Sequence, residues 1–217
     1  MPVTTFHRYI DQYPILPEST KLIIGTIHPH RVVNFNIDFF YGNMGSFWDI
    51  LSLSFPNHQF GNRHQILTTF RNYGVSITDI IRQCDRENEY VTEDSKLYNL
   101  IDNGVQIQEG LIHSNINTIY FTSRFGVNNA AKLFVERFGI KYTDTFNQQT
   151  SQFMIKSNVF GREIRAVVLY SPSNNANRGI ARSAPYLNNI DRYQHFEAPI
   201  KQFKIEFYRD KFGFFNE

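Results

Sequence analysis

Cysteine is almost absent from this chain of 217 residues, in which Cys84 is the only one. A single thiol excludes a disulfide framework, a four-cysteine zinc site and a cysteine-ligated iron–sulfur cluster. An excess of charge of one sign is also missing, because 22 Lys and Arg oppose 20 Asp and Glu and leave a net charge of +2. The total charge therefore does not by itself indicate a nucleic-acid or membrane partner.

Long hydrophobic runs are missing as well. No uncharged apolar run approaches the roughly 18 residues that a membrane-spanning helix needs. Residues 1–13 contain His7, Arg8 and Asp11 and lack the apolar centre of a signal peptide. We therefore expect a cytoplasmic protein without a membrane partner.

Aromatic residues are abundant, with 21 Phe and 12 Tyr. A chain this rich in large apolar rings can bury a substantial core, which excludes low-complexity disorder. The length suits one compact domain, and the sequence has neither an internal repeat nor a linker. We expect residues 1–217 to form a single domain.

Strand and helix patterns alternate along the chain. Strands are predicted at Lys21–Gly25, Ile116–Thr122, Phe153–Val159 and Glu163–Tyr170. Helices are predicted at Ser46–Phe55, Asn62–Tyr73, Asp94–His113 and Asn128–Phe138, and the tail Ile200–Phe215 is expected to be helical or extended. Strands separated by helices indicate an α/β fold with a largely parallel sheet, whose ligands bind outside the carboxyl ends of the strands.

One segment of unusual composition follows the first predicted strand. It begins Gly-Thr-Ile-His-Pro-His at Gly25 and continues into the aromatic stretch Phe39–Trp48. Phe39, Phe40 and Tyr41 are consecutive, so in an extended conformation one of these rings faces away from the core. Such a ring can stack on a flat ligand, and stacking a nucleobase contributes about 1–3 kcal/mol. The alternative is that all three rings are core or rim residues.

A second such segment, Ser171–Arg178, follows the last predicted strand and is small and polar. Its side chains are of the kinds that bond phosphates and base edges. Residues 156–182 contain Lys156, Arg162, Arg165, Arg178 and Arg182 against Glu163, so this stretch carries 5 − 1 = +4. The alternative is an ordinary surface turn with solvated arginines.

The pair His28 and His30 also fits a metal site, because alternate residues of an extended segment point to the same side. The further ligands would come from Asp38, His58 or His64, which have no characteristic spacing. Partly buried, hydrogen-bonded histidines are the commoner explanation. Nothing in the sequence pairs Cys84 with a base that would activate it as a nucleophile.

Taken together, these segments resemble the uracil-DNA glycosylase superfamily, most closely its hypoxanthine-DNA glycosylase and mismatch-specific branches. The match extends over about residues 20–180 and depends on the order of the motifs. The motifs are Gly25–Pro29, the aromatic stretch Phe40–Leu51, Gly74–Ile81 continuing to Arg86, Ile119–Thr122 with Ala130 and Ala131, and Leu169–Asn177.

The resemblance implies a three-layer α/β/α sandwich around a mostly parallel sheet. It also implies a monofunctional DNA glycosylase that flips a deaminated base, uracil or hypoxanthine, out of DNA and hydrolyses its N-glycosidic bond with water. Such an enzyme needs no cofactor, metal or covalent intermediate, and we expect it to be a monomer whose partner is DNA containing the deaminated base.

The same resemblance assigns residues to roles. The candidate catalytic residues are His28, Asn43 and Ser46. The candidate base-binding residues are Gly25, Thr26, Phe40, Tyr41 and Asp79. The candidate DNA-binding residues are Ser171, Ser173, Asn174, Asn175, Asn177 and Arg178.

The chain departs from the family pattern at the catalytic positions. His28 stands where several members have Asp or Asn before the proline, and Gly45 stands where the hypoxanthine branch has a functional Asn. Ser171 stands where the uracil-specific branch has a histidine. Two alternatives follow: a catalytically attenuated or inactive nucleic-acid-binding protein of the same fold, and a metal-dependent hydrolase that uses His28 and His30.

Overall fold

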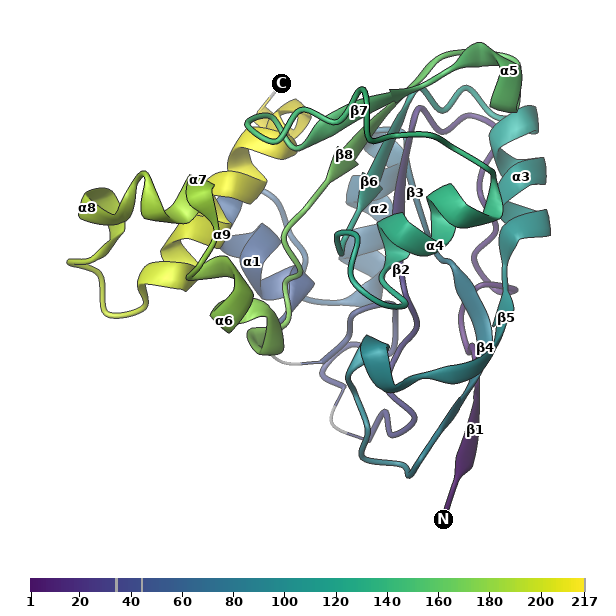
Figure 1. Cartoon of the computed structure of the whole chain (residues 1–217), viewed down its shortest axis with the longest axis horizontal. Coiled ribbons are helices and arrows are strands. Elements are labelled where there is room, and N and C mark those ends of the chain that lie inside the picture. Colours follow the sequence, from purple (N-terminus) through teal and green to yellow (C-terminus); the bar gives the residue numbers. More distant parts are fainter. Residues whose placement is uncertain (34, 44, 217) are drawn as a thin grey trace. The chain divides into compact units, whose positions relative to one another are not determined.

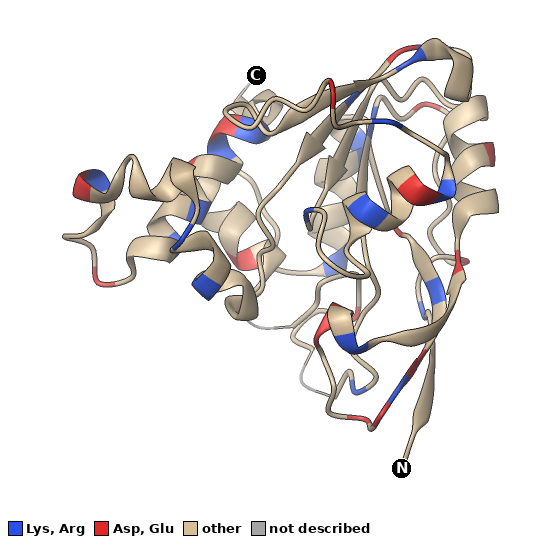
Figure 2. Cartoon of the chain, in the orientation of Figure 1, with Lys and Arg blue, Asp and Glu red and all other residues tan. Residues whose placement is uncertain are grey.

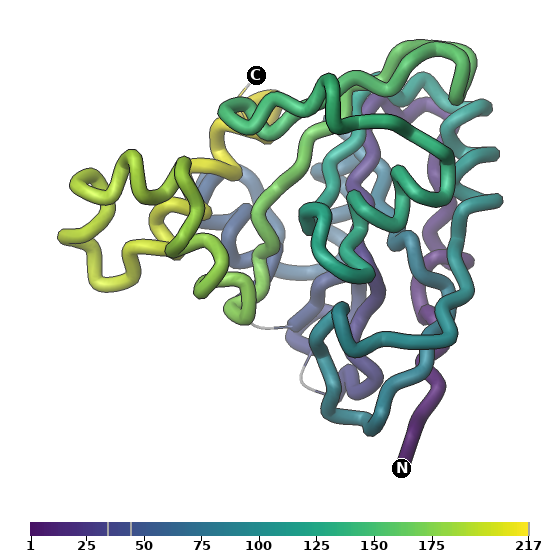
Figure 3. The backbone as a smooth tube through the Cα atoms, viewed as in Figure 1, coloured from purple at the N-terminus to yellow at the C-terminus, as the bar shows by residue number. Residues whose placement is uncertain are grey.

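The computed structural model describes residues 1–33, 35–43 and 45–216 (Figure 1). Contacts within the chain group these residues into two compact units. Residues 1–33 and 70–169 form the first unit, and the rest of the described chain forms the second. The chain crosses from one unit to the other after residues 34, 69 and 169, as the trace in Figure 3 allows the reader to follow.

The first unit contains every strand of the described chain. Its strands are β1 (Val3–Phe6), β2 (Lys21–Gly25), β3 (Val75–Asp79), β4 (Ile81–Arg86), β5 (Tyr98–Asp102), β6 (Thr118–Phe121), β7 (Gln152–Ile155) and β8 (Ile164–Val168). Its helical elements are η1 (Asp94–Lys96), α3 (Gly104–His113), α4 (Ala130–Arg137) and α5 (Ser157–Phe160).

The second unit is helical. Its elements are α1 (Phe47–Ser54), η2 (Asn174–Ala176), α6 (Asn177–Ile180), α7 (Ala184–Leu187), α8 (Ile190–Tyr193), α9 (Pro199–Lys211) and η3 (Gly213–Asn216). Helix α2 (Arg63–Asn72) begins in this unit and ends in the first.

A five-stranded sheet of order β3-β2-β6-β8-β7 organises the first unit. Strand β2 pairs in parallel with β3 and with β6, and β6 pairs in parallel with β8, whereas the edge strand β7 is antiparallel. The α/β class with a largely parallel sheet is thereby confirmed. In this register Gly25 lies opposite Asp79, so the carboxyl ends of β2 and β3 meet at one edge of the sheet.

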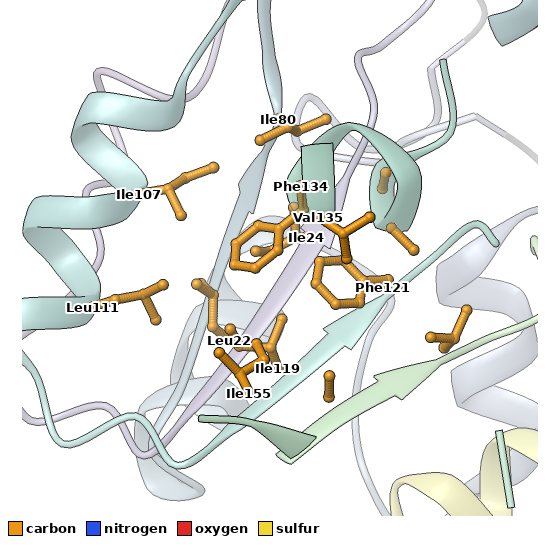
Figure 4. Close-up of a cluster of buried hydrophobic side chains, with 14 of the residues drawn as sticks. Leu22, Ile24, Ile80, Ile107, Leu111, Ile119, Phe121, Phe134, Val135 and Ile155 are labelled. Carbon is orange, nitrogen blue, oxygen red and sulfur yellow. The ribbon is translucent and has the colours of Figure 1, made fainter. Parts of the chain in front are cut away.

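One face of this sheet carries the main apolar core of the unit (Figure 4). Alternate strand residues point to this face, as a strand period of two requires. Helices α3 and α4 cover it with their apolar sides. The labelled members are Leu22, Ile24, Ile80, Ile107, Leu111, Ile119, Phe121, Phe134, Val135 and Ile155.

A second, antiparallel sheet of order β1-β4-β5 was not predicted. It also corrects the helix expected over residues 94–113, which divides into η1, β5 and α3. Residues 98–102 pair with β4, and this pairing overrides their helix propensity. The side-chain amide of Asn103 donates to Thr78 Oγ1 at 3.2 Å and to the Asp79 carbonyl at 3.1 Å, which fixes the point where α3 begins.

The strand expected over residues 153–159 was also too long. Strand β7 ends at Ile155, and the next residues turn into α5. Gly161 ends this short helix in the left-handed conformation, with φ 78°, which glycine adopts without strain. The turn expected at Gly161 is therefore present, but a helical turn precedes it.

In the second unit the tail is helical, with α9 packed on α1. Ser54 Oγ donates to the Ile205 carbonyl at 2.9 Å, and Arg209 Nε donates to the Ser54 carbonyl at 3.0 Å. The bond from Arg209 satisfies the carbonyl of the last residue of α1, which has no partner within the helix, and the bond from Ser54 ties α1 to α9. No helix in the described chain is long and apolar enough to cross a membrane.

Candidate functional site

The predicted site residues fall into both units. Gly25, Thr26, His28 and Asp79 lie in the first, at the edge where β2 and β3 end. The remaining candidates, residues 40–46 and 171–178, lie in the second unit. Each group is surrounded by polar contacts of its own.

A buried polar cluster occupies the strand edge of the first unit. We call it the strand-edge cluster, and its members are Thr5, His7, Thr26, His28, Asp79, Arg86 and Asp94. Four of these side chains were not candidates from the sequence. Two of the four, Thr5 and Arg86, lie in β1 and β4, which were not predicted as strands.

Asp79 is paired with His7 inside this cluster. His7 Nε2 lies 2.8 Å from Asp79 Oδ2, and both side chains are almost fully buried. The backbone N–H groups of Tyr9 and Ile10 donate to His7 Nδ1 at 3.1 and 3.3 Å. Because Nδ1 accepts, the ring proton is on Nε2 and is donated to the carboxylate. In this arrangement His7 positions Asp79 and is not set up as a base.

His28 is buried, with both ring nitrogens bonded inside the cluster. The Arg8 backbone N–H donates to Nε2 at 3.1 Å, and Nδ1 donates to the Pro29 carbonyl at 2.7 Å. Burial lowers the pKa of His28 to about 4, so the ring is neutral at pH 7. The ring can therefore reach a water molecule only if one of these two bonds opens.

Arg86 is 1% exposed and ties the cluster together. It donates to Thr5 Oγ1 at 3.0 Å, to the Val91 carbonyl at 2.7 Å and to the His28 carbonyl at 2.9 Å. Burial lowers its pKa. Three bonds to neutral acceptors fix the backbone that follows β2, which makes Arg86 a structural clamp for the predicted Gly25–Pro29 motif.

Thr26 bonds to a carboxyl group that the sequence did not single out. Its Oγ1 donates to Asp94 Oδ2 at 2.9 Å. Burial raises the pKa of Asp94 to about 6, against the lowering effect of this hydrogen bond. Perturbed carboxyl groups are frequent both at functional sites and in buried structural networks.

The histidine pair does not form a metal centre with other ligands. His30 Nδ1 lies 3.1 Å from Thr5 Oγ1, and the His28 nitrogens are bonded as described. Among residues 1–33, 35–43 and 45–216, no three His, Cys, Asp or Glu side chains are grouped so that they could hold a metal ion.

In the second unit the aromatic stretch forms a tight turn around Gly42. Phe39 and Phe40 are 0% and 1% exposed, and their rings meet edge to face at 5.1 Å. Tyr41 is half-buried and has a φ of 54°, an uncommon value for an aromatic residue. The Trp48 indole holds this turn by donating to the Phe40 carbonyl at 2.6 Å.

The burial of Phe40 bears directly on its predicted role. Its ring is covered in this ligand-free structure, as the core alternative expects, and Tyr41 is the ring of the triplet that remains partly exposed. Stacking a base on Phe40 would therefore require neighbouring side chains to move.

The candidate catalytic residues of this unit differ in their exposure to solvent. Ser46 is buried, and its Oγ lies within bonding distance of the Tyr41 and Asn43 carbonyls, at 2.8 and 2.7 Å. Asn43 is exposed. Gly45 has a φ of 70°, and its N–H bonds to the Asp49 carboxylate at the start of α1.

The polar loop, residues Ser171–Arg178, is built from two small turns. Ser171 Oγ accepts from the Ser173 N–H at 3.3 Å, and Ser173 Oγ accepts from the Asn175 N–H at 3.2 Å. Asn174, Asn175 and Arg178 are exposed. These turns use the serine side chains locally and present the asparagines and the arginine to solvent.

Asn177 carries an unused acceptor. Its Oδ1 is buried and accepts no hydrogen bond from the described residues. Leaving such an atom unsatisfied costs about 1–3 kcal/mol, so Asn177 Oδ1 is stabilised by any donor that reaches it, water included.

The polar loop and the aromatic turn lie next to each other. A Cβ atom added to Gly45 would lie 3.8 Å from Asn174 Nδ2, an ordinary van der Waals distance. Two motifs about 130 positions apart in the sequence thus lie together within the second unit. The predicted site needs this adjacency for the candidates of the aromatic turn and the polar loop.

The basic stretch is divided between the units. Lys156, Arg162 and Arg165 belong to the first unit, and Arg178 and Arg182 to the second. Arg162 has a structural role, because its guanidinium donates to the Ile116 and Leu111 carbonyls at 2.9 and 2.5 Å. Lys and Arg occur along both units (Figure 2); Arg178 at the end of the polar loop and Arg182 just beyond it are exposed.

One residue near the polar loop was missed from the sequence. Lys204 on α9 is 2% exposed and donates to two carbonyls of the loop. In the sequence, the burial of Lys204 is indicated only by its apolar neighbours Phe203 and Ile205. The same helix also contributes Tyr208 to the core.

No protein-family model matches this sequence, and no curated protein is significantly similar to it. The resemblance to glycosylases therefore depends on the motifs and their order.

Proposed function

We propose that this chain is a uracil-DNA glycosylase-like domain that acts, as a monomer, on DNA containing uracil or hypoxanthine. The observation that carries the proposal is that a Cβ atom built on Gly45 of the aromatic turn would lie only 3.8 Å from Asn174 Nδ2 of the polar loop. In the resembled family the corresponding motifs act on the same flipped nucleotide, so their adjacency in one unit is what the proposal needs.

The chemistry of the polar loop supports nucleic acid as the ligand. Exposed asparagine amides and an exposed arginine match phosphate oxygens and base edges, and the unsatisfied Asn177 Oδ1 can accept from a base amino or imino group. Flipping costs a few kcal/mol of unstacking, and a mismatched deaminated base requires less.

The reaction is a hydrolysis at the sugar C1′ atom. The C1′–N bond breaks with its electron pair leaving on the base, the oxygen of water bonds to C1′, and the proton of water passes to the departing base. A side chain that orients this water must be able to reach it. Among the three candidates this favours Asn43, because the side chains of His28 and Ser46 bond to neighbouring groups of the protein.

A second candidate function is favoured by one specific feature. At Gly45 the chain has no side chain where the hypoxanthine branch has a functional Asn, and His28 is bonded at both nitrogens. A protein with these substitutions is suited to bind damaged DNA without cleaving it.

The test uses duplex oligonucleotides with a single uracil, hypoxanthine or normal base, incubated with enzyme and then treated with alkali. We expect strand cleavage at the deaminated base, and Asn43→Ala is expected to reduce the rate by about 100-fold, the size of the loss when a reactant is misplaced by about 1 Å. Asn158→Ala, an exposed asparagine on α5, is the matched control and should leave the rate unchanged. Absence of cleavage at stoichiometric protein would refute catalysis, and salt-sensitive binding without cleavage would select the second function.

A further inference from the structure

Lys204 places a positive charge inside the second unit. The residue is 2% exposed and lies on α9 between Phe203 and Ile205, which are also buried. A fully buried lysine is rare unless it has a partner that compensates its charge.

The partners of Lys204 are two successive carbonyls of the polar loop. Its Nζ donates to the Pro172 carbonyl at 3.1 Å and to the Ser173 carbonyl at 2.9 Å. The Ser173 carbonyl also accepts from the Ala176 N–H at 3.2 Å, the bond that closes η2. The ammonium group therefore holds the turn that carries Asn174 and Asn175.

We infer that Lys204 is the positioning residue of the polar loop, and that it fixes the loop in the conformation in which Asn174, Asn175 and Arg178 contact a nucleic-acid phosphodiester. The ligand class in this inference rests on the proposed function. The two hydrogen bonds by which Lys204 holds the loop do not depend on that function. Lys204 acts through the loop, because its own ammonium is covered and cannot reach a phosphate directly.

Among the residues that the structure describes, no carboxylate forms an ion pair with Lys204. Several charged and titratable groups lie on the elements around Lys204. Those outside its own helix are Tyr170 just before the polar loop, Arg178 in it, Asp49 of α1, and Asp191, Arg192 and Tyr193 of α8. Those on α9 itself are Lys201, Glu206, Tyr208, Arg209, Asp210 and Lys211. The carboxylates among them bond elsewhere, Asp49 to the Gly45 N–H and Glu206 to Arg192 and Tyr193.

Burial alone lowers the pKa of Lys204 to about 8. The ammonium form is thus retained at pH 7 although the site disfavours it, and a methionine of similar length would fill the space without this penalty. A lysine donates hydrogen bonds to the two loop carbonyls, whereas a methionine has no donor for them.

The first experiment measures amide hydrogen exchange of residue 171 and residues 173–177 in the free protein. Lys204→Met is expected to speed their exchange at least tenfold, while Lys201→Met, a matched exposed lysine on the same helix, leaves it unchanged. Should Lys204→Met fail to fold, the wild type supplies the test. Opening the loop returns Lys204 to water and raises its pKa, so protection corrected for intrinsic rates should rise between pH 7 and 9.5, and Lys204→Arg should remove this pH dependence. Equal protection in all variants and at all pH values would overturn the inference.

The second experiment measures binding of a fluorescein-labelled uracil-containing duplex at 50 mM salt by anisotropy. Lys204→Met is expected to weaken binding at least tenfold and Lys201→Met less than twofold. Lys204→Arg, which keeps a cation at this position, is expected to retain affinity within about threefold of the wild type. If the wild type binds the duplex without releasing the base, the proposed catalysis fails while this inference stands. If it binds no duplex, the phosphodiester assignment is overturned, whatever the exchange result.

Discussion

Lys204 also makes a quantitative prediction about stability, because its burial is not offset by an ion pair. The perturbation is Lys204→Met, which removes the ammonium and keeps a side chain of similar length. The pKa falls from 10.5 to about 8 in the folded protein. One pKa unit corresponds to about 1.4 kcal/mol, so the ammonium form is disfavoured in the fold by about 3 kcal/mol.

The sign of the pH dependence follows from proton uptake. Between pH 8 and 10.5 the unfolded chain keeps the Lys204 proton while the folded chain has lost it. The unfolded state therefore binds more protons in this window, and the stability of the wild type rises with pH relative to the variant. Between pH 7 and pH 10 the difference in unfolding free energy, wild type minus Lys204→Met, should rise by about 2.5 kcal/mol.

The assay is urea unfolding of both proteins at pH 7, 8, 9 and 10, followed by circular dichroism and by tryptophan fluorescence. Taking the difference between the proteins cancels the titration of the other lysines and tyrosines, provided that both probes report one transition. A difference that stays constant from pH 7 to 10 would refute the reasoning that Lys204 is buried and charged.

Three further predictions concern other parts of the fold. Gly42→Ala should destabilise the protein by more than about 2 kcal/mol in urea unfolding, since its Cβ would lie 1.8 Å from the Ile37 carbonyl oxygen; Gly179→Ala, with no atom within 4 Å, should change stability by less than about 1 kcal/mol. Arg86→Met leaves three buried acceptors without their donor and should cost about 3–5 kcal/mol, and a loss under about 1 kcal/mol would contradict its role as a clamp. Asp94→Asn should gain stability relative to wild type, by at most about 3 kcal/mol, as pH rises from 4 to 6, because the folded pKa is raised to about 6; parallel thermal melts at the two pH values measure this.

The parallel sheet and most helices could be predicted because their apolar residues follow one period. Strand β2 is a continuous buried run, and α1 and α4 place their apolar residues on one face. The three-stranded sheet could not be predicted in the same way. In β4 the inward position at residue 86 is an arginine, and β5 is largely exposed on both sides, so neither shows the alternation of a half-buried strand.

The sequence predicted only those parts of the candidate site whose residues are close together in the chain. The aromatic stretch and the polar loop were found from composition, and their adjacency at Gly45 and Asn174 needed the fold. Arg8 and His7, which bond to His28 and Asp79, follow directly after β1 and are distant in sequence, so no local pattern could have indicated these bonds. Lys204 was missed for a related reason: a lysine within a helix is read as solvated unless the acceptors on a distant loop are known.

The central claim is base excision, and the most direct measurement is mass spectrometry of the free base. The full chain is incubated with a duplex containing one uracil or one hypoxanthine, and the released base and the abasic strand are quantified together. The account predicts equimolar free base and abasic DNA from at least one of these substrates, and none from the undamaged duplex. Intact damaged strands after prolonged incubation with stoichiometric protein would contradict it.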